Sequence, residues 1–583
     1  MEDTTSQWPM TNTEHGILVA FGEYLTQQGL IEKLMEVPVK QKTREYRPQS
    51  KLIEFLAGIM SGMEYLQDLN YGSHPLTKDA AVAQAWGQTG FAHYSGVSRT
   101  LDACDEETVR AVEGVIREFS RPFITLSVDE LLRTGQAIVY DLDLTGQSVS
   151  STSQVYPEAA FGWMDDGVKL GYQLALVCMQ SAQGERIWLA GSHHPGDTVS
   201  ASCLKELMLA AEAQTGIRPR RRTEWVQERI QAQNRVVVRR QELIRRQQEK
   251  QERLQQSRKS LIGKIFHATQ LLKQTNSAPK AARLQAQIVG WEKRQPRVEA
   301  ELIQCQQVLF KHEAQLAKQE HRLKALQAWR TQLEMDNLSN PDPPLVIEAR
   351  MDAGFASSEN LTWLLEMGYS INTKALNNRI TAALRARVLP QTRWVRVGDN
   401  AEMTAWGDYH LHGCPFPLTV ALERFKVKGK YKYATLILYR DDGLYPTLPV
   451  WFEQYNARQT IEAGNKELKG TFFVQHLMSR SLAGIRIQVL FTGLAANAVR
   501  WCQPWLQTCT TIPSPHWLRT LTSPKHLIRV AANTTALVQR SRSGLALQFA
   551  PDSPFPGVTL LLHGVPAFQL AFNFNRPFKI EPG

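Results

Sequence analysis

The chain has 583 residues, 43% of them hydrophobic, so it is long enough for three or more domains and too apolar for a disordered protein. Its N-terminus lacks a secretory signal, and no uninterrupted apolar run is long enough to cross a bilayer, so we expect a cytosolic protein without a membrane partner. The seven cysteines are too scattered for a disulfide framework or a paired metal motif.

The net charge of +11 is concentrated in residues 217–260. This segment has fourteen Arg or Lys and five Glu, and cations at this density favour contact with nucleic-acid phosphates. A solvated basic helix is an equally good interpretation, because charged helix faces are common in soluble proteins.

Residues 1–125 are expected to form a helical N-terminal domain. Residues 51–69 have apolar side chains at helical spacing, and another helix is expected after residues 98–105. Such a domain ahead of a nuclease core often binds DNA, but no groove-reading pattern is recognisable, and an ordinary helical bundle is the alternative.

Residues 126–216 change in character to strands. Three apolar, β-rich segments separated by turn residues predict a meander: residues 136–145, 170–178 and 185–191. His193 and His194 are expected in a turn, before a helix that Asp197 or Thr198 caps and that runs to about Thr215. Histidines in such a turn are more often polar surface groups than catalytic ones.

Residues 217–340 predict an inserted antiparallel coiled coil. Four leucines recur every seven residues, and four further residues keep the companion spacing: Leu302, Leu309, Leu316, Leu323 and Val298, Cys305, Leu326, Leu333. An earlier arm, residues 224–274, has a weaker repeat: Ile230, Val237, Ile244, Ile265 and Leu272. Each arm would be roughly 75 Å long, with an interruption at Pro296. Pairing within the chain and pairing with another subunit both stay open.

Residues 341–370 return to the pattern of strands and helices. A buried-type strand at 345–351 ends at Asp352, and a helix starts near Ser357. Residues 371–429 are β-rich, and residues 430–505 open with a strong strand at 431–439 and close with a helix at 481–500. Residues 506–583 form a mixed segment with strands near 558–562. His410, His412 and Cys414 resemble metal ligands, but a hairpin turn is the favoured interpretation.

Residues 455–469 predict a helix with a polar stripe. At 100° per residue, Tyr455, Arg458, Glu462 and Lys469 lie within about 60° of one another. Four apolar residues cluster about 100° away from them: Val450, Ala457, Ile461 and Leu468. Gly470 is expected to end the helix. A solvated face with a chance pattern is the alternative.

The order Y-x2-R-x3-E-x6-K in this helix resembles the YREK signature of bacterial insertion-sequence transposases with a DDE catalytic triad. The resemblance covers about residues 136–216 and 344–505. It implies a ribonuclease H-like mixed sheet core with a β-rich insertion. With the helical N-terminal domain and the inserted coiled coil, the chain is expected to be a multidomain α/β protein. The long coiled coil is not part of the usual pattern.

The resemblance requires two aspartates on upstream strands. Asp141 and Asp143 point to the same face of the first strand, and Asp143 is preferred because it is nearer the carboxyl end. In the ribonuclease H-like fold this strand lies beside a parallel fourth strand, which here ends at Asp352. The two aspartates are 209 positions apart, and removing the 124-residue insertion leaves 85, enough for two strands and a helix.

Three carboxylates in one cleft repel one another unless cations are present, and oxygen ligands favour Mg²⁺ or Mn²⁺. Two such ions promote phosphoryl transfer at a phosphodiester. By resemblance, Asp143, Asp352 and Glu462 bind the ions, and the other three signature residues hold the phosphates of the transposon end: Tyr455, Arg458 and Lys469.

The resemblance also implies a partner and a location. Double-stranded DNA, as terminal inverted repeats and target, would be bound by a homodimer in the cytoplasm of a bacterium, associated with the nucleoid. Members of this group often cut through a DNA hairpin, and Trp394 or Trp406 is a candidate to stack on a flipped base. A structure-specific nuclease of the same fold and a catalytically silent DNA-binding relic are the competing functions.

Overall fold

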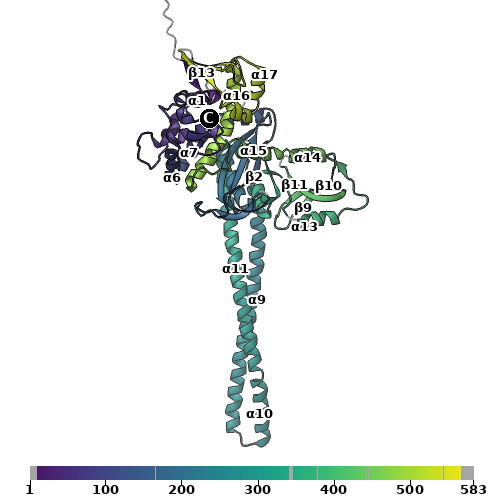
Figure 1. The fold of residues 1–583 in the computed structure, drawn as a ribbon. Coiled ribbons are helices and arrows are strands. Elements are labelled where there is room, and N and C mark those ends of the chain that lie inside the picture. The colour runs from purple at the N-terminus through teal and green to yellow at the C-terminus, as the bar shows by residue number, and fades with distance from the viewer. Residues whose placement is uncertain are drawn as a thin grey trace, which may run out of the picture. The chain divides into compact units, whose positions relative to one another are not determined.

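The computed structural model describes residues 10–164, 166–340, 346–376, 378–440, 443, 446–541 and 544–565. The chain divides into two compact units, one of residues 1–219, 345–365 and 369–583 and one of residues 220–344 and 366–368. The first unit contains helices and strands, and the second consists mainly of long helices (Figure 1). The chain is therefore a mixed α/β protein.

The larger sheet of the first unit has the order β3-β4-β2-β6-β7-β11-β10-β9-β8, and β5 also pairs with β4. Its strands are β2 (Ile138–Ser148), β3 (Ala160–Met164), β4 (Gly167–Gln180), β5 (Arg186–Pro195), β6 (Ile347–Met351), β7 (Ser370–Lys374), β8 (Val395–Arg396), β9 (Ala401–His410), β10 (Pro417–Val427) and β11 (Lys430–Tyr439). The expected meander is present as β2, β4 and β5, joined by antiparallel pairs. The expected parallel pair of first and fourth strands is present as β2 and β6.

The β-rich stretch after β7 extends the same sheet. β11 pairs antiparallel with β7, and β10, β9 and β8 follow outward. Helix α13 (Asn378–Ala386) precedes these strands and packs on β11 and β10. His410 ends β9, and His412 and Cys414 lie in the turn before β10, so the favoured hairpin interpretation is confirmed.

The histidines before the next helix lie elsewhere than expected. β5 runs on through Pro195, so His193 and His194 are strand residues, paired with Leu174 and Gln173 of β4. The expected turn at His193 is therefore wrong, because the β4 ladder continues past it. Helix α8 (Ser200–Thr215) starts after Val199, and neither Asp197 nor Thr198 is its N-cap.

The N-terminal helices and the C-terminal segment share one hydrophobic core with the sheet. The helices are α1 (Gly16–Gln27), α2 (Leu30–Leu34), α3 (Pro48–Met60), α4 (Asp68–Tyr71), α5 (Ala80–Ala85), α6 (Tyr94–Ala103) and α7 (Glu106–Arg133). The helix expected at 51–69 is shorter, because α3 ends before Gly62, whose φ of 76° is not helical. Asp105 caps α7, which follows residues 98–105 as expected.

A second sheet joins the two ends of the described chain. Its order is β1-β13-β14-β15-β12, and β1 pairs antiparallel with β13. The elements are β1 (Met10–Thr13), β12 (Thr510–Ile512), α17 (Pro515–Leu521), α18 (Pro524–His526), a π-helical turn (Leu527–Ala531), β13 (Ala536–Ser541), β14 (Gly544–Phe549) and β15 (Thr559–Leu562).

Helix α16 (Leu482–Cys509) is the central core helix of this unit. Among the described residues it alone is long and apolar enough by mean hydropathy to cross a membrane, although polar and charged residues interrupt its apolar run. Most of its apolar window, 78%, is buried inside the protein. The helix also carries Arg486 and Arg500, which pair with Glu106 and Glu467. These features are those of a helix in a soluble core.

The signature residues do not lie on one continuous helix, contrary to our expectation. Helix α14 (Leu448–Asn456) ends before Ala457, and α15 (Gln459–Gly470) begins after Arg458. At the junction the backbone N–H groups of Arg458, Thr460 and Ile461 bond three residues back, as in a 3₁₀ turn. Val450, expected among the buried apolar residues, is 42% exposed. The end at Gly470 is as expected.

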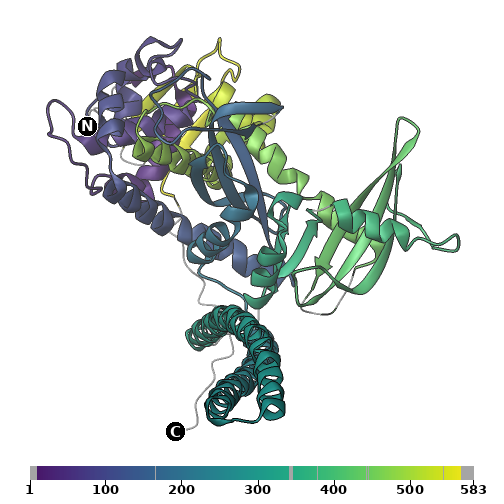
Figure 2. The same ribbon diagram turned by 90° about the horizontal axis from the view of Figure 1, so that it is seen from below.

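The second unit is an antiparallel helical hairpin that folds on itself. Helix α9 (Thr223–Gln274) runs beside α10 (Ala278–Glu292) and α11 (Gln295–Leu338), and Pro296 lies at the start of α11, after a break (Figure 1). Figure 2 views the hairpin nearly along its length and shows its arms coiling around each other. Heptad residues of both arms form the seam, with Val237, Leu302 and Leu333 buried.

Helix α15 packs closely on the sheet through Gly464. A Cβ there would lie 2.6 Å from Nη1 of Arg186 and 2.8 Å from the ring of Trp188, both on β5. Gly464→Ala should therefore lower the free energy of unfolding by about 1–3 kcal/mol, measured by urea denaturation. Gly470→Ala is the matched control, since nothing lies within 4 Å of its Cβ position. It should leave stability unchanged or raise it by up to about 1 kcal/mol, and equal effects of the two changes would contradict this packing.

Candidate active site

Asp141 is half of a buried ion pair. Its carboxylate accepts hydrogen bonds from Nε of Arg350 at 2.6 Å and from Nη2 at 2.7 Å. Nη1 of Arg350 donates to the carbonyl oxygen of Gln454 on α14 at 2.7 Å. The side chains of Asp141 and Arg350 are 0% and 4% exposed. Asp141 thus ties β2 to β6, and Asp143 is left as the candidate ligand.

Asp143 and Asp352 follow the same step of the parallel ladder between β2 and β6. Asp352 comes directly after the end of β6, whereas Asp143 lies within β2, which its pairing with β4 extends to Ser148. The parallel register pairs Asp141 with Arg350 and Leu142 with Met351, so the two aspartates come next on adjacent strands. Neighbouring strands lie about 5 Å apart. The Asp352 carboxylate also accepts the backbone N–H of Gly354 at 2.8 Å, which fixes its orientation after β6 ends. The two predicted carboxylates are therefore neighbours.

Glu462 reaches this pair through Arg458. Nη2 of Arg458 lies 2.6 Å from Oε1 of Glu462, and Nη1 lies 3.7 Å from Oδ1 of Asp143. Glu462 is in the first turn of α15, four residues after Arg458, so the two side chains share one helix face. The guanidinium lies between two of the predicted carboxylates.

The electrostatics of the site link all three carboxylates. The pKa of Asp143 is raised to about 6, mainly by burial, with Arg458 lowering it and the nearby charges of Asp352 and Glu462 raising it. Burial also raises the pKa of Tyr455 to about 12, with Arg458 opposing the change and Asp352 adding to it. A cation close to Asp143 would therefore favour its ionised form by offsetting the free-energy cost of burying the charge.

The donors at this site fit a hard divalent cation. Among the described residues no three His, Cys, Asp or Glu side chains are arranged as a metal site in this conformation, in which Arg458 holds Glu462. Two buried atoms here have no hydrogen-bond partner, Nη1 of Arg458 and Oδ1 of Asn465. Asn465 also donates from Nδ2 to Asp143 at 2.6 Å. Glu462 is 49% exposed and is held by Arg458, and the carboxylate and amide oxygens of this site are of the kind that Mg²⁺ and Mn²⁺ prefer.

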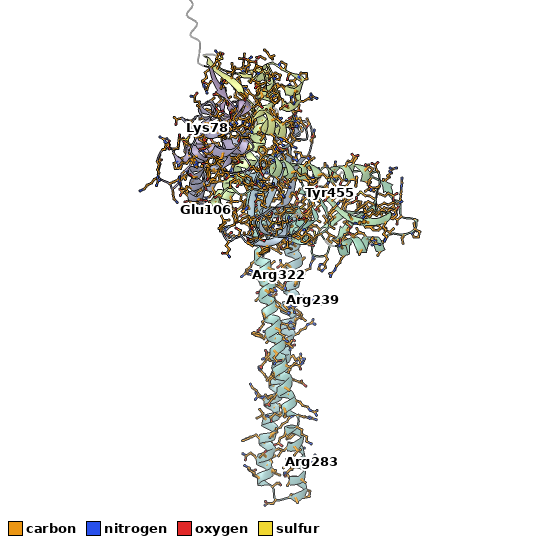
Figure 3. The ribbon with its side chains drawn as sticks, in the orientation of Figure 1. Lys78, Glu106, Arg239, Arg283, Arg322 and Tyr455 are labelled. Atoms are coloured by element: carbon orange, nitrogen blue, oxygen red, sulfur yellow. The ribbon has the colours of Figure 1, made fainter. Side chains whose placement is uncertain are left out.

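Tyr455 and Lys469 lie in different environments. Tyr455, labelled in Figure 3, is 5% exposed and packs in a core with Trp451. Nζ of Lys374 lies 5.2 Å from the centre of its ring. Only the Tyr455 hydroxyl is thus available for a ligand. Lys469 is half-buried near the end of α15, seven residues beyond Glu462 and about 10 Å further along the helix axis.

The β-rich extension presents cations stacked on aromatic rings. The Arg424 guanidinium lies 4.0 Å from the ring centre of Trp394 and 5.0 Å from that of Tyr431. Further pairs are Lys426 with Tyr431, Arg387 with Tyr409 and Arg385 with Tyr433. Trp394 is half-buried under Arg424, and Trp406 is half-buried on β9. Alternating rings and cations suit contact with nucleic-acid bases and phosphates.

Two residues of the site were not predicted. Asn465 is one helical turn after Glu462, so its spacing could have predicted that it lies on the same face of the helix. Arg350 lies two residues before Asp352 and hence on the same face of β6, but its pairing with Asp141 depends on the strand register.

The cavity that contains His193 is separate from the three carboxylates. Burial lowers the pKa of His193 to about 3, so this histidine is neutral at physiological pH. It lines a cavity of about 610 Å³ with residues of α7, α8 and α16, a lining that includes none of the three carboxylates. All seven cysteines are buried and free.

Asp143→Asn should stabilise the metal-free protein at high pH. Because the folded-state pKa of Asp143 is raised from 3.8 to about 6, its favourable contribution is complete below pH 4 and is lost as the pH rises through 6. The variant should therefore match the wild type near pH 4 and exceed it by about 1–3 kcal/mol at pH 8, in denaturant titrations. Mg²⁺ at pH 8 should stabilise only the wild type.

Asp141→Asn provides the contrast, because it removes the partner of the buried Arg350. It should destabilise the protein by about 3–5 kcal/mol at pH 8. The same response to both substitutions would contradict the separate roles of the two aspartates.

No protein-family model and no curated protein matches this chain. The function is therefore inferred from the residues of the site and their geometry. Asp143, Asp352 and Glu462, which the sequence predicted as one set, are neighbours around Arg458, with Asn465 added.

Proposed function

We propose that the chain is a DNA transposase that cuts and joins DNA strands by metal-dependent phosphoryl transfer. The observation that carries the proposal is the convergence of Asp143, Asp352 and Glu462 on the Arg458 guanidinium. These carboxylates come from two adjacent strands and one helix, the order that the DDE resemblance requires.

The strand order supports a ribonuclease H-like core. Numbered along the chain without the short β3, the strands β5-β4-β2-β6-β7 have the order 3-2-1-4-5. The first three are antiparallel neighbours, and the first, fourth and fifth are parallel. The coiled coil then falls between the helix after the third strand and the fourth strand. Fold alone does not give function, so the proposal depends on the carboxylates.

Asp143, Asp352 and Glu462 would hold two Mg²⁺ or Mn²⁺ ions. When bound, the ions supply activation of a water or 3′-hydroxyl and stabilisation of the leaving oxygen. Asn465 orients Asp143 through its 2.6 Å hydrogen bond. Arg458 neutralises the carboxylates without metal, and once Glu462 turns away its guanidinium is available to a phosphate.

Arg458, Lys469 and the Tyr455 hydroxyl would contact the phosphates of the transposon end. Arg458 and Lys469 are eleven residues apart, about three helical turns, so they would meet different phosphates. Of the two candidate tryptophans we favour Trp394, stacked with Arg424, as the residue that would receive an unpaired base. Such a contact is expected if cleavage passes through a DNA hairpin.

Terminal inverted repeats and target DNA would be bound by a homodimer, since joining requires two DNA ends to be held together. The protein would act in the bacterial cytoplasm, associated with the nucleoid. The buried position of α16 supports a soluble protein.

Two alternatives share the same fold. A structure-specific nuclease would cut without joining, and a catalytically silent relic would bind without cutting. Labelled DNA from both flanks of the reading frame, incubated with the protein and Mg²⁺, separates them. Joined products support the transposase, cut products alone support the nuclease, and binding alone supports the relic.

Glu462→Gln should abolish strand cleavage while DNA binding is retained, because the amide removes a metal-ligand charge without changing shape. Cleavage is measured on the labelled flanking DNA and binding by fluorescence anisotropy. Glu467→Gln, on the same helix but paired with Arg500, is the control and should keep cleavage. Unchanged cleavage by Glu462→Gln would refute the metal role.

Lys469→Ala should weaken DNA binding and reduce the slope of log K against log salt by roughly 0.9, the value for one lost phosphate contact. The comparison variant is Lys466→Ala, an exposed lysine one turn earlier on α15. The phosphate role of Lys469 is withdrawn if its salt slope equals that of the wild type.

A further inference from the structure

The two arms of the helical hairpin differ in charge. Helix α9 has twelve Arg or Lys and five Glu, a net charge of +7. The other arm, residues 278–338, has ten Arg or Lys and seven Asp or Glu, a net charge of +3, and its helix α11 alone is neutral. Solubility alone does not require this difference in charge, because both arms are long, largely exposed helices.

The cations of α9 form a strip on its outer side. Arg239, Arg246 and Arg253 are seven residues apart, so they recur at one position of the coiled coil. Three more cations lie within about 60° of this position on the helix: Arg235, Lys250 and Lys264. All six are exposed, whereas Val237 and Ile244 of the same helix are buried in the seam. We call these six residues the α9 strip.

Most of the α9 strip is not neutralised by acids. Glu242 and Glu249 are acids on the same side. Glu242 pairs with Arg245 and Arg246, and the charge of Glu249 also acts on Arg245. Within the described part of the chain, the other five cations of the strip form no ion pair. A row of like charges on one helix is unfavourable unless an anion lies against it.

Polar pairs in the seam hold the α9 strip in a fixed position. Hydrogen bonds join Gln233 to Gln319 at 2.9 Å, Arg240 to His312 at 2.9 Å and Gln247 to Cys305 at 3.1 Å. Each step is seven residues forward on α9 and seven residues back on α11. Polar groups at regular seam positions specify the register of a coiled coil, so the strip is preorganised rather than formed by loose side chains.

We propose that the α9 strip binds the phosphate backbone of double-stranded DNA along the hairpin. From Arg235 to Lys264 the strip is about 43 Å long, which exceeds one turn of B-DNA, about 34 Å. Its guanidinium and ammonium groups contact phosphates without reading sequence. The inference rests on the proposed function, because it takes DNA as the partner, but the contact is separate from the carboxylates.

The test compares two triple substitutions that remove the same charge from the two arms. Arg239→Gln with Arg246→Gln and Arg253→Gln acts on the α9 strip. Lys311→Gln with Lys318→Gln and Arg322→Gln acts on exposed positions of α11 (Figure 3 labels Arg239 and Arg322). Glutamine has nearly the helix propensity of arginine and lysine, and far-ultraviolet circular dichroism checks that both hairpins remain helical.

Affinity is measured on the full chain by fluorescence anisotropy with a labelled 30-base-pair duplex of arbitrary sequence, in EDTA and over a salt series. The α9 triple should bind at least about 10-fold more weakly at 0.1 M salt and lose roughly 2.7 from the salt slope, whereas the α11 triple should match the wild type. Equal losses in both triples, or no loss in either, would overturn the proposal. A change in sedimentation of the free protein without a change in salt slope would assign the strip to a second copy instead.

The strip and the catalytic proposal fail separately. Cleavage of flanking DNA by the wild type in Mg²⁺ is read independently of binding in EDTA. Loss of the salt slope in the α9 triple, with no cleavage by the wild type, would keep the strip and reject the transposase. Cleavage by the wild type, with an unchanged salt slope in the α9 triple, would keep the transposase and reject DNA binding by the strip.

Discussion

The buried pair of Asp141 and Arg350 is the interaction on which the site depends. It locks the register of two parallel strands that are far apart in sequence, and only in that register do Asp143 and Asp352 become neighbours. Its third hydrogen bond, to the backbone of Gln454, ties the helix before the signature to the same point. A buried pair is weak as a source of stability but strong as a constraint on geometry, because either partner alone is costly to bury.

Arg458 lies between Asp143 on the sheet and Glu462 on α15. Without metal, its guanidinium offsets the repulsion among carboxylates, one of which burial already disfavours as an anion. The same side chain is well suited to a phosphate. On the proposed function, one residue would neutralise the carboxylates without metal and would bind the substrate once a metal ion competes with it for Glu462. The adjoining 3₁₀ turn places Arg458 outside both helices.

Local patterns predicted much of this structure, and tertiary contacts decided the rest. The heptads of the hairpin and the strand that ends at Asp352 were predictable, since each depends on nearby residues. The break in the helix between Tyr455 and Gln459 could not be predicted, because the polar and apolar residues keep their helical spacing across it. Strand β3 was not predicted, because it has only five residues. Strand β5 extends beyond its predicted apolar segment because β4 continues to pair with it. The role of Arg350 follows only from the strand register.

The central claim is that a metal ion replaces Arg458 among Asp143, Asp352 and Glu462. Anomalous diffraction from crystals of the protein grown with Mn²⁺ tests it most directly, because manganese is located without reference to activity. The account predicts anomalous peaks within about 2.3 Å of oxygens from Asp143 and Asp352, with Glu462 turned away from Arg458. Ordered crystals in excess Mn²⁺ with no peak at these carboxylates, and with Arg458 still bound to Glu462, would contradict it.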